Sequence, residues 1–302
     1  MAEKGWEWSI PVSREAYADA LAGKWDIVLK PIIPVPHNWF FPFLKNVRLD
    51  GVSLLGFASG GGQQMPIMEA IMKQKALEYL ERNSVLYMGM IFLIKRGSVD
   101  IIYAEKDGVF IKDTESGVYM LASDNFVNSN ELLDAAGRQA HICFYQKATA
   151  DYYHKKFKHK KYAINIQAVY TKTEYVELRS HDLDIRPLTR SHLDWVHDQN
   201  GHDHEYLIER LESGMIFGGY LHDELRGSVG VHRDGSIGML AVPSEFRGRG
   251  HAFELEGYMV NTLLGREHMP FSQIEYNNDA SIGLHKKLGF AISSDTIYRL
   301  ID

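Results

Sequence analysis

The sequence has little cysteine, no long apolar run and no excess of basic charge. Its single cysteine, Cys143, excludes an intramolecular disulfide and fits a reducing compartment. The longest apolar run, Val85–Ile94, is about half the ~20 residues that a membrane-spanning helix needs. The formal net charge of -6 argues against a dedicated nucleic-acid-binding protein, whose domain is usually strongly basic.

The N-terminal residues MAEKGWEWSI also lack the basic stretch followed by an apolar stretch that marks a signal peptide. We therefore expect a cytoplasmic protein with no membrane partner and no nucleic-acid partner. Hydrophobic residues make up 45% and charged residues 24% of the 302 residues, which is the balance of a globular protein that buries a core. The length suits one large domain or two ordinary ones.

Proline is absent from Ile67 to Arg186, whereas six of the nine prolines lie in the first 66 residues. That first segment predicts extended chain leading to a strand at Gly51–Ala58. From Met68 onward the apolar residues, among them Ile71 and Met72, follow helical spacing. The composition therefore predicts a seam in the chain near residue 68.

Beyond the seam the pattern predicts a mixed α/β sheet. Alternating residues at 98–123, cut by the turn dipeptides Asp107-Gly108 and Ser116-Gly117, indicate strands. The stretches QAHICFYQ and YAINIQAVY indicate two more, with a helix between them. From Asp182 the order is a strand, two short helices, three strands, a loop, a helix, a strand, a helix and a last strand. This order is not the strict alternation of a doubly wound fold.

The stretch LLGFASGGGQQMP resembles the cofactor loop of class I S-adenosylmethionine methyltransferases. Such a site needs a second parallel strand that ends in an acidic residue about 20 residues later. Here Glu78 and Glu81 occupy that position, but they fall in a helical pattern. We therefore interpret residues 1–69 as a truncated methyltransferase-like segment ahead of a different protein.

A second glycine-bearing loop, RGRGHA at Arg247–Ala252, lies between a predicted strand and a predicted helix. Its two glycines permit tight backbone curvature, and the amides that follow point outward at the positive end of the helix dipole. Two arginines add positive charge. The loop therefore predicts a site for a pyrophosphate group.

This loop and the stretch NNDASIGLHKKLGF at Asn277–Phe290 together resemble the GNAT superfamily of N-acetyltransferases. The resemblance implies a GNAT fold with a mixed central sheet and acetyl-CoA as cosubstrate. It implies that Leu240–Val242 pair with the pantetheine arm, where a backbone amide would hold the thioester oxygen. The residues that it assigns to the cofactor are Leu240, Ala241, Val242, Arg247, Gly248, Arg249, Gly250, His251, Ala252, Asn278 and Ser281.

Within that superfamily the histidine in LHKKLGF is most similar to the glycine N-acyltransferase-like branch, which places a degenerate GNAT-like half before the catalytic one. The resemblance thus implies three parts. These are a methyltransferase-like segment at 1–69, a degenerate GNAT-like domain at 70–178 and a catalytic GNAT domain at 182–302.

The implied reaction is direct attack of an amine on the acyl thioester, for which a base must deprotonate the amine. Most GNAT enzymes have tyrosine where this chain has His285, which we expect to serve as the acid. No carboxylate lies between Gly235 and Ser244, so Glu275 and His232 are the candidate bases, and a water chain is a third route. We expect no metal, because His202 and His204 are two residues apart on a helix and point in different directions.

The sequence therefore predicts an N-acetyltransferase that transfers an acetyl or short acyl group to a small-molecule or peptide amine. Two alternatives stay open. The missing strand carboxylate and the missing tyrosine fit a non-catalytic acyl-CoA-binding or sensor protein, and the first glycine loop fits a bifunctional protein with methyltransferase activity. The sequence also leaves a homodimer open.

Overall fold

The computed structural model describes residues 8–9, 55–56, 64–178 and 182–302 of the chain. The first two pairs are β1 (Trp8–Ser9) and β2 (Leu55–Gly56), which form a short antiparallel ladder. The rest of the chain up to residue 63, with the triple glycine of the first loop, lies outside the described residues. The fold of the methyltransferase-like segment therefore stays a prediction.

The first long helix, α2 (Gln64–Leu80), begins four residues before the position that the apolar spacing predicts. Pro66 stands in its first turn. Proline is tolerated there because the first-turn amides have no partner within a helix. The helix therefore crosses the seam that the composition predicts near residue 68, and it does not begin there.

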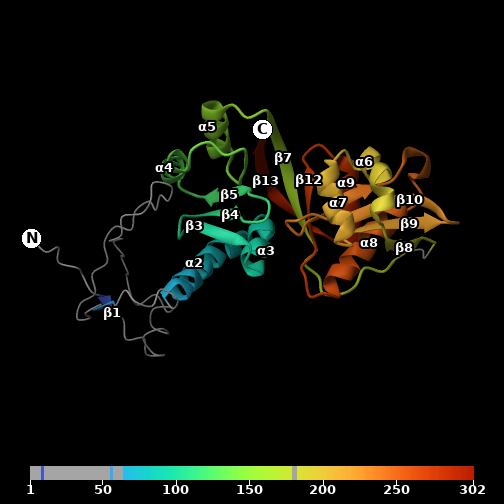
Figure 1. Ribbon diagram of the computed structural model, residues 1–302, viewed down its shortest axis with the longest axis horizontal. Helices are drawn as coiled ribbons and strands as arrows, with labels where there is room; N and C mark the ends of the chain where they lie inside the picture. The colour runs from blue at the N-terminus through green and yellow to red at the C-terminus, as the bar shows by residue number, and fades with distance from the viewer. Residues whose placement is uncertain (1–7, 10–54, 57–63, 179–181) are drawn as a thin grey trace, which may run out of the picture.

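The N-terminal half, residues 64–178, places helices on both faces of a sheet (Figure 1). The segments that form α3 (Met88–Arg96) and α4 (Phe126–Ala136) were not predicted as helices. After α2 its elements are η1 (Glu81–Asn83), α3 (Met88–Arg96), β3 (Val99–Glu105), β4 (Gly108–Asp113), β5 (Tyr119–Ser123), α4 (Phe126–Ala136), β6 (His141–Phe144), α5 (Lys147–Phe157) and β7 (Lys161–Val169).

The C-terminal half, residues 182–302, follows the predicted order of elements. Thr189 begins its first helical stretch with a capping box, and Gly214 follows the second helix at φ +67°. The elements are β8 (Asp184–Pro187), η2 (Arg190–His192), α6 (Leu193–Asn200), α7 (His204–Glu212), β9 (Ile216–Leu221), β10 (Glu224–Val231), β11 (Ile237–Ala241), η3 (Ser244–Phe246), α8 (His251–Leu264), β12 (Phe271–Glu275), α9 (Asp279–Leu288) and β13 (Ala291–Ile301).

One 11-stranded mixed sheet runs through both halves, in the order β3-β4-β5-β6-β13-β7-β12-β11-β10-β9-β8. The last strand of each half pairs with the other half. β13 lies antiparallel beside β6, and β7 lies antiparallel beside β12. β7 and β13 also pair with each other and occupy the middle of the molecule in Figure 1. The two halves are therefore joined by exchanged strands, although the domain boundaries themselves stay predictions.

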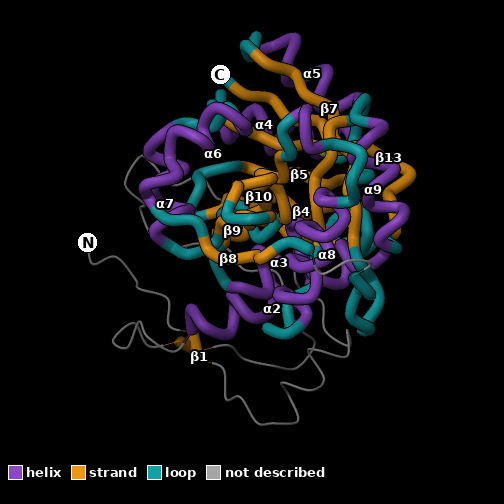
Figure 2. The backbone as a smooth tube through the Cα atoms, turned by 90° about the vertical axis from the view of Figure 1, so that its right-hand side faces the viewer, coloured by secondary structure: helices purple, strands orange, loops and turns teal. Residues whose placement is uncertain are grey.

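Each half buries apolar side chains on both faces of the sheet. In the C-terminal half α6 and α7 lie on one side of the strands and α8 and α9 on the other, as Figure 2 shows. In the N-terminal half α2 and α3 share a core with Ile297, whereas α5 shares one with Leu300. Successive strand residues point to opposite faces, so the central strand β13 serves both cores.

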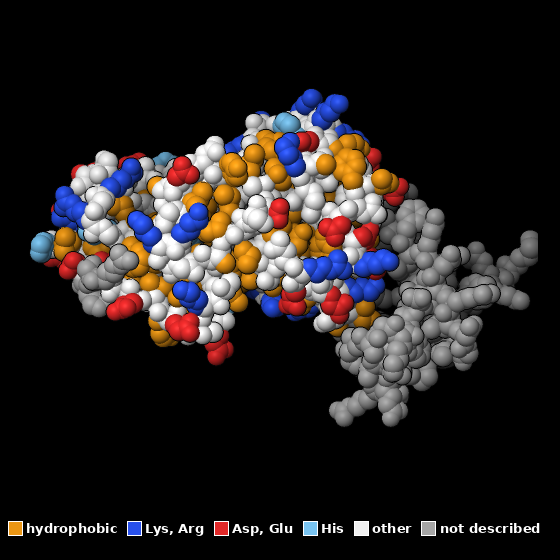
Figure 3. All heavy atoms as spheres, turned by 180° about the vertical axis from the view of Figure 1, so that it is seen from behind, with side chains coloured by type: hydrophobic (Ala, Val, Ile, Leu, Met, Phe, Trp, Pro, Cys, Tyr) orange, Lys and Arg blue, Asp and Glu red, His pale blue; other side chains and the backbone are white. Residues whose placement is uncertain are grey.

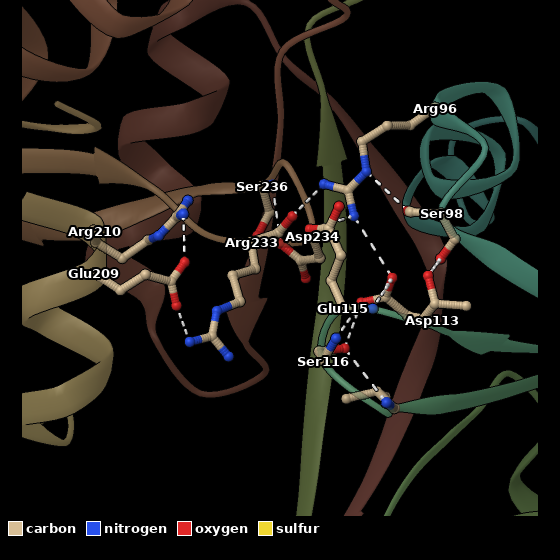
Figure 4. Close-up of polar contacts among 12 residues, drawn as sticks. Arg96, Ser98, Asp113, Glu115, Ser116, Glu209, Arg210, Arg233, Asp234 and Ser236 are labelled. Atoms are coloured by element: carbon tan, nitrogen blue, oxygen red, sulfur yellow. Dashed lines mark hydrogen bonds and ion pairs between the residues drawn. The ribbon is translucent and has the colours of Figure 1, made fainter. Parts of the chain in front are cut away.

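The turn between β10 and β11 contacts α3 of the other half (Figure 4). Arg96 donates a hydrogen bond to the backbone oxygen of Arg233 in this turn. The same guanidinium forms ion pairs with Asp113, at 3.5 Å, and Glu115, at 3.1 Å. Asp234 caps the turn by accepting from the amide and hydroxyl of Ser236. Arg96 thus ties the β10–β11 turn to the N-terminal half.

Charged side chains of both signs are interspersed on the face seen from behind in Figure 3, with a group of Lys and Arg at its top. The lysine-rich stretch at the end of α5, residues 154–161, is exposed at all five lysines, Lys155, Lys156, Lys158, Lys160 and Lys161. Among the described helices none is long and apolar enough to cross a membrane.

Candidate functional site

The parallel strands β11 and β12 pair at one position and then separate. That pair is Ile237 with Ser272, near the start of both strands. Beyond it β11 carries an irregularity, since its register with β10 shifts and Met239 has φ +51°. Ser228 holds the bulge by donating to the backbone oxygen of Met239 at 3.0 Å. A bulge bends a strand, so the two strands open into a gap toward their carboxyl ends.

The gap leads to the predicted pyrophosphate loop. Gly248 and Gly250 have φ of +75° and +89°, and a side chain at either would meet no atom within 4 Å. The glycines therefore serve the backbone conformation rather than close packing. Gly250 is the N-cap of α8, and no side chain caps the helix there. The positive end of the α8 dipole thus opens onto the loop.

The two arginines of the loop are exposed and are held by backbone oxygens. Arg247 donates from Nε to the oxygen of Val242 at 2.8 Å, and Arg249 donates to the oxygen of Glu245 at 3.3 Å. Neither guanidinium pairs with a carboxylate within the described ranges. Their positive charge is therefore available to an anion bound at the start of α8.

The side chain of His251 is not suited to bind an anion. It is 6% exposed, and its Nδ1 has no hydrogen-bond partner among the residues described. Burial lowers the pKa of His251 and the nearby Arg226 and Arg249 lower it further, although Glu254 acts in the opposite direction. A neutral, buried ring adds no charge to the loop, so only the backbone amide of His251 is suited to an anion.

Asn278 and Ser281 lie at the start of α9. Asn278 is the N-cap, and its Oδ1 accepts a hydrogen bond from the amide of Ser281 at 3.1 Å. The hydroxyl of Ser281 lies 3.4 Å from Nδ1 of His285. These contacts explain the motif locally, as a helix start, and the assignment of both residues to the cofactor stays a prediction.

His285 is buried, and an oxygen atom lies near each of its ring nitrogens. Its Nε2 lies 2.8 Å from Oε1 of Glu256 on α8, and its Nδ1 lies 2.8 Å from the backbone oxygen of Ser281. Burial on its own lowers the pKa of His285, but the bond and the charge of Glu256 outweigh it, so the pKa is raised. The nearby Glu256 carboxylate therefore favours the protonated form of the ring.

His232 lies in the β10–β11 turn rather than along the gap. Its Nδ1 is hydrogen-bonded to the hydroxyl of Tyr206 at 2.5 Å, and the two rings stack. Burial lowers the pKa of His232 to about 4, against the opposing charge of Asp234. Such a group is a weak base at neutral pH.

Glu275 lies level with the expected thioester position. Three residues beyond the pair Ile237–Ser272 are Leu240 on β11 and Glu275 on β12. Because the bulge puts one extra residue into β11 between Gly238 and Ala241, the β11 residue nearest in height to Glu275 is Ala241 rather than Leu240. Glu275 is exposed, and no described residue donates to its carboxylate or pairs with it. The structure thus brings Glu275 to the gap and leaves His232 and His285 engaged elsewhere.

Two residues beside Glu275 were not identified from the sequence. Asn165 on β7 pairs directly with Glu275, and Gln167 pairs with Gln273. Both are buried, and Asn165 Oδ1 and Gln167 Oε1 have no hydrogen-bond partner within the described parts of the chain. The sequence does mark these two residues, because their amides alternate inside the otherwise apolar strand YAINIQAVY. No pattern in the sequence, however, places that strand beside β12.

Other candidate features lie elsewhere. Two cavities, of about 310 and 210 Å³, border the junction of the halves near α3 and do not include the gap. In the described ranges no group of three or more His, Cys, Asp or Glu side chains is arranged to hold a metal ion.

Residues 210–300 match the family model described as FR47-like protein, which is GNAT-like. The matched range includes β9 to β12, the pyrophosphate loop, both flanking helices and most of β13. It confirms the GNAT resemblance of the C-terminal part, in which the two motifs lie.

A stretch of 68 residues is 40% identical to a curated protein of Bacillus subtilis named uncharacterized methyltransferase YbaJ. It is 22% of this chain and 24% of that protein, so the chain spans about a quarter of the length of this curated relative. The methyltransferase resemblance is thereby confirmed for a short stretch.

The fold is similar to that of a Drosophila protein solved by X-ray crystallography, with a TM-score of 0.58 and 12% sequence identity. The likeness covers 78% of this chain and 96% of that protein. A GCN5-related N-acetyltransferase-like protein from Streptococcus suis has a TM-score of 0.47 at 13% identity, over 74% of this chain and 99% of its own. The first likeness shows that the fold is shared over both halves, and the chain has a mixed α/β fold whose C-terminal part resembles GNAT proteins.

Proposed function

We propose that this chain transfers an acetyl or other short acyl group from acyl-CoA to a primary amine. One observation carries the proposal. The gap between β11 and β12 leads to the uncapped start of α8, beside two arginines that lack carboxylate partners in the described ranges. That arrangement suits a long ligand with an anionic pyrophosphate at one end.

In this proposal the pantetheine arm lies along Leu240–Val242 on β11. The bulge at Met239 turns the backbone out of register with β10, and this frees nearby groups from the ladder. A backbone amide of this stretch stabilises the oxyanion that forms when the amine attacks the thioester. The acetyl–nitrogen bond forms, the carbon–sulfur bond breaks, and the CoA thiolate departs.

We assign the base to Glu275. A protonated alkylamine needs to lose a proton before it attacks. Glu275 is exposed and ends β12 beside the gap, whereas His232 is buried in the turn, and burial lowers its pKa. His285 as the acid for the departing thiolate stays a prediction, since its proton would have to leave the bond with Glu256.

A second function has one observation in its favour. β11 carries no carboxylate, so a protein that binds acyl-CoA without transferring the acyl group is the alternative. The methyltransferase resemblance supports a third function, a bifunctional protein, over a short stretch.

A cytoplasmic location fits the free thiol of Cys143. Whether the protein acts as a homodimer is part of the same open proposal.

Calorimetric titration of acetyl-CoA, and separately of S-adenosylmethionine, into the full-length protein tests the proposal. Arg247→Ala and Gly250→Asp should weaken acetyl-CoA binding strongly, because they remove a cation and place an anion at the start of α8. Gly283→Ala is the matched control, since its added methyl group would meet no atom within 4 Å. Binding followed by thiol release with an amine panel supports transfer. Binding without release supports the sensor, and no acetyl-CoA binding overturns both.

A further inference from the structure

The wall of the gap on the β12 side is built partly by the N-terminal half. β7, from that half, lies directly beside β12 along its whole length, from Phe271–Val169 to Glu275–Asn165. Residues paired across two antiparallel strands point to the same face of the sheet. Asn165 therefore stands on the same face as Glu275, and Gln167 stands on the same face as Gln273.

This face is opposite to the one that α8 and α9 cover. Ala168 and Ile274, which alternate with these polar residues, belong to the core under α8 and α9. On the polar side, a methyl group at Gly89 of α3 would lie 3.4 Å from Nε2 of Gln273 and 3.9 Å from Oε1 of Gln167. The polar residues thus run from the exposed Glu275 inward, beneath α3.

Two carbonyl oxygens on this face lack partners. Asn165 is 6% exposed and Gln167 is 0% exposed, yet neither Asn165 Oδ1 nor Gln167 Oε1 accepts a hydrogen bond from any described residue. Gln167 donates from Nε2 to the backbone oxygen of Ser272 at 3.2 Å, which fixes the orientation of its amide. Folded proteins leave few buried polar atoms of this kind without an explanation.

Both unpartnered atoms are acceptors, and this selects the chemistry of a ligand. An amide oxygen accepts from N–H or O–H and repels a carboxylate or phosphate. An amine or ammonium group supplies N–H donors. The Asn165 oxygen lies next to the strand position of Glu275, where an amine would lose its proton under the proposed function.

We propose that Asn165 belongs to the acceptor site, where its Oδ1 accepts a hydrogen bond from the amine and orients the nitrogen toward Glu275. The N-terminal half therefore supplies part of the substrate site through β7. This inference rests on the proposed acyl transfer.

Steady-state kinetics of the full-length protein, with amine and acetyl-CoA varied separately, test the role of Asn165. Asn165→Leu removes the acceptor at similar volume, and it should raise the KM for the amine about tenfold. The KM for acetyl-CoA and kcat should change far less. Asn165→Ser keeps an acceptor oxygen and should recover part of the loss. Glu275→Gln should instead lower kcat.

Ile164→Leu is the matched control, because this exposed residue lies on the same strand but on the other face. Urea unfolding of each variant checks that it is folded. An equal rise in both KM values, or no change in the amine KM, overturns the role of Asn165 while leaving acyl transfer intact. A wild-type protein that binds no acetyl-CoA overturns the proposed function itself, and one that binds it but acetylates no amine overturns the acceptor site.

Discussion

His285 and Glu256 form a buried ion pair between α9 and α8, with 2.8 Å between Nε2 and Oε1. The two residues are 3% and 1% exposed. Because Nδ1 of the same ring bonds the backbone oxygen of Ser281, the imidazole is held on both sides. The pair thus links the helix that follows the pyrophosphate loop to the helix of the second motif.

The ion pair predicts a pH dependence of stability. The pKa of His285 is raised from its ordinary value of 6.5, so the folded state binds this proton more tightly than the unfolded state. The contribution is fully present below the unfolded pKa and is lost as pH rises through the raised, folded pKa. The free energy of unfolding in urea, measured across that range, should fall more steeply with pH in wild type than in His285→Gln. Equal slopes in wild type and His285→Gln would contradict this pH dependence. His268→Gln, at an exposed histidine, is the control.

The C-terminal fold and its loop were predictable because local rules govern them. Gly248 and Gly250 occupy positive-φ positions that strongly favour glycine, and Asn278 caps a helix whose spacing the sequence reveals. The strand, loop and helix around residue 250 therefore follow from nearby residues.

The exchanged strands and the ion pair were not predictable in this way. β7 could have paired within its own half, and only packing over the whole chain places it between β13 and β12. Glu256 reads as an ordinary polar position of α8 until α9 brings His285 onto it. The apolar run at the start of α3 could be read as a strand or a helix, since short apolar runs fit both.

Gly250 has a left-handed backbone, with φ +89°, that a side chain would strain. Gly250→Ala should destabilise the protein by about 1–2 kcal/mol, because an L-residue is disfavoured in that region. Space is not the reason, since the methyl group would meet no atom within 4 Å. Gly283→Ala, inside α9, should instead stabilise by about 0.5–1 kcal/mol. Urea unfolding compares the two variants, and equal changes would show that the loop does not depend on this conformation.

Gly238 faces the ring of His232 across the β10–β11 hairpin. A methyl group at Gly238 would overlap Nε2 of His232, whose ring is fixed by Tyr206. Gly238→Ala should therefore destabilise by about 1–3 kcal/mol through overpacking. His232→Ala in the same chain should recover most of this loss, so the double-mutant cycle gives a coupling energy of the same order. Additive effects in thermal or urea unfolding would show that the ring moves aside freely.

The contacts of Arg96 predict that the two halves unfold cooperatively. Its guanidinium contacts Asp113, whose side chain is fully buried, and the backbone oxygen of Arg233 in the other half. Arg96→Met keeps much of the apolar length but leaves these acceptors with fewer donors, so it should cost about 1–3 kcal/mol.

The same change should make unfolding less cooperative, because it removes a contact between the β10–β11 turn and α3. Urea titrations followed by circular dichroism and by fluorescence should coincide in wild type and separate in Arg96→Met. Arg190→Met is the control, since Arg190 forms an exposed pair with Glu212 at 3.0 Å and should change stability by less than about 1 kcal/mol. Coincident transitions in Arg96→Met would mean that the exchanged strands β7 and β13 alone couple the halves.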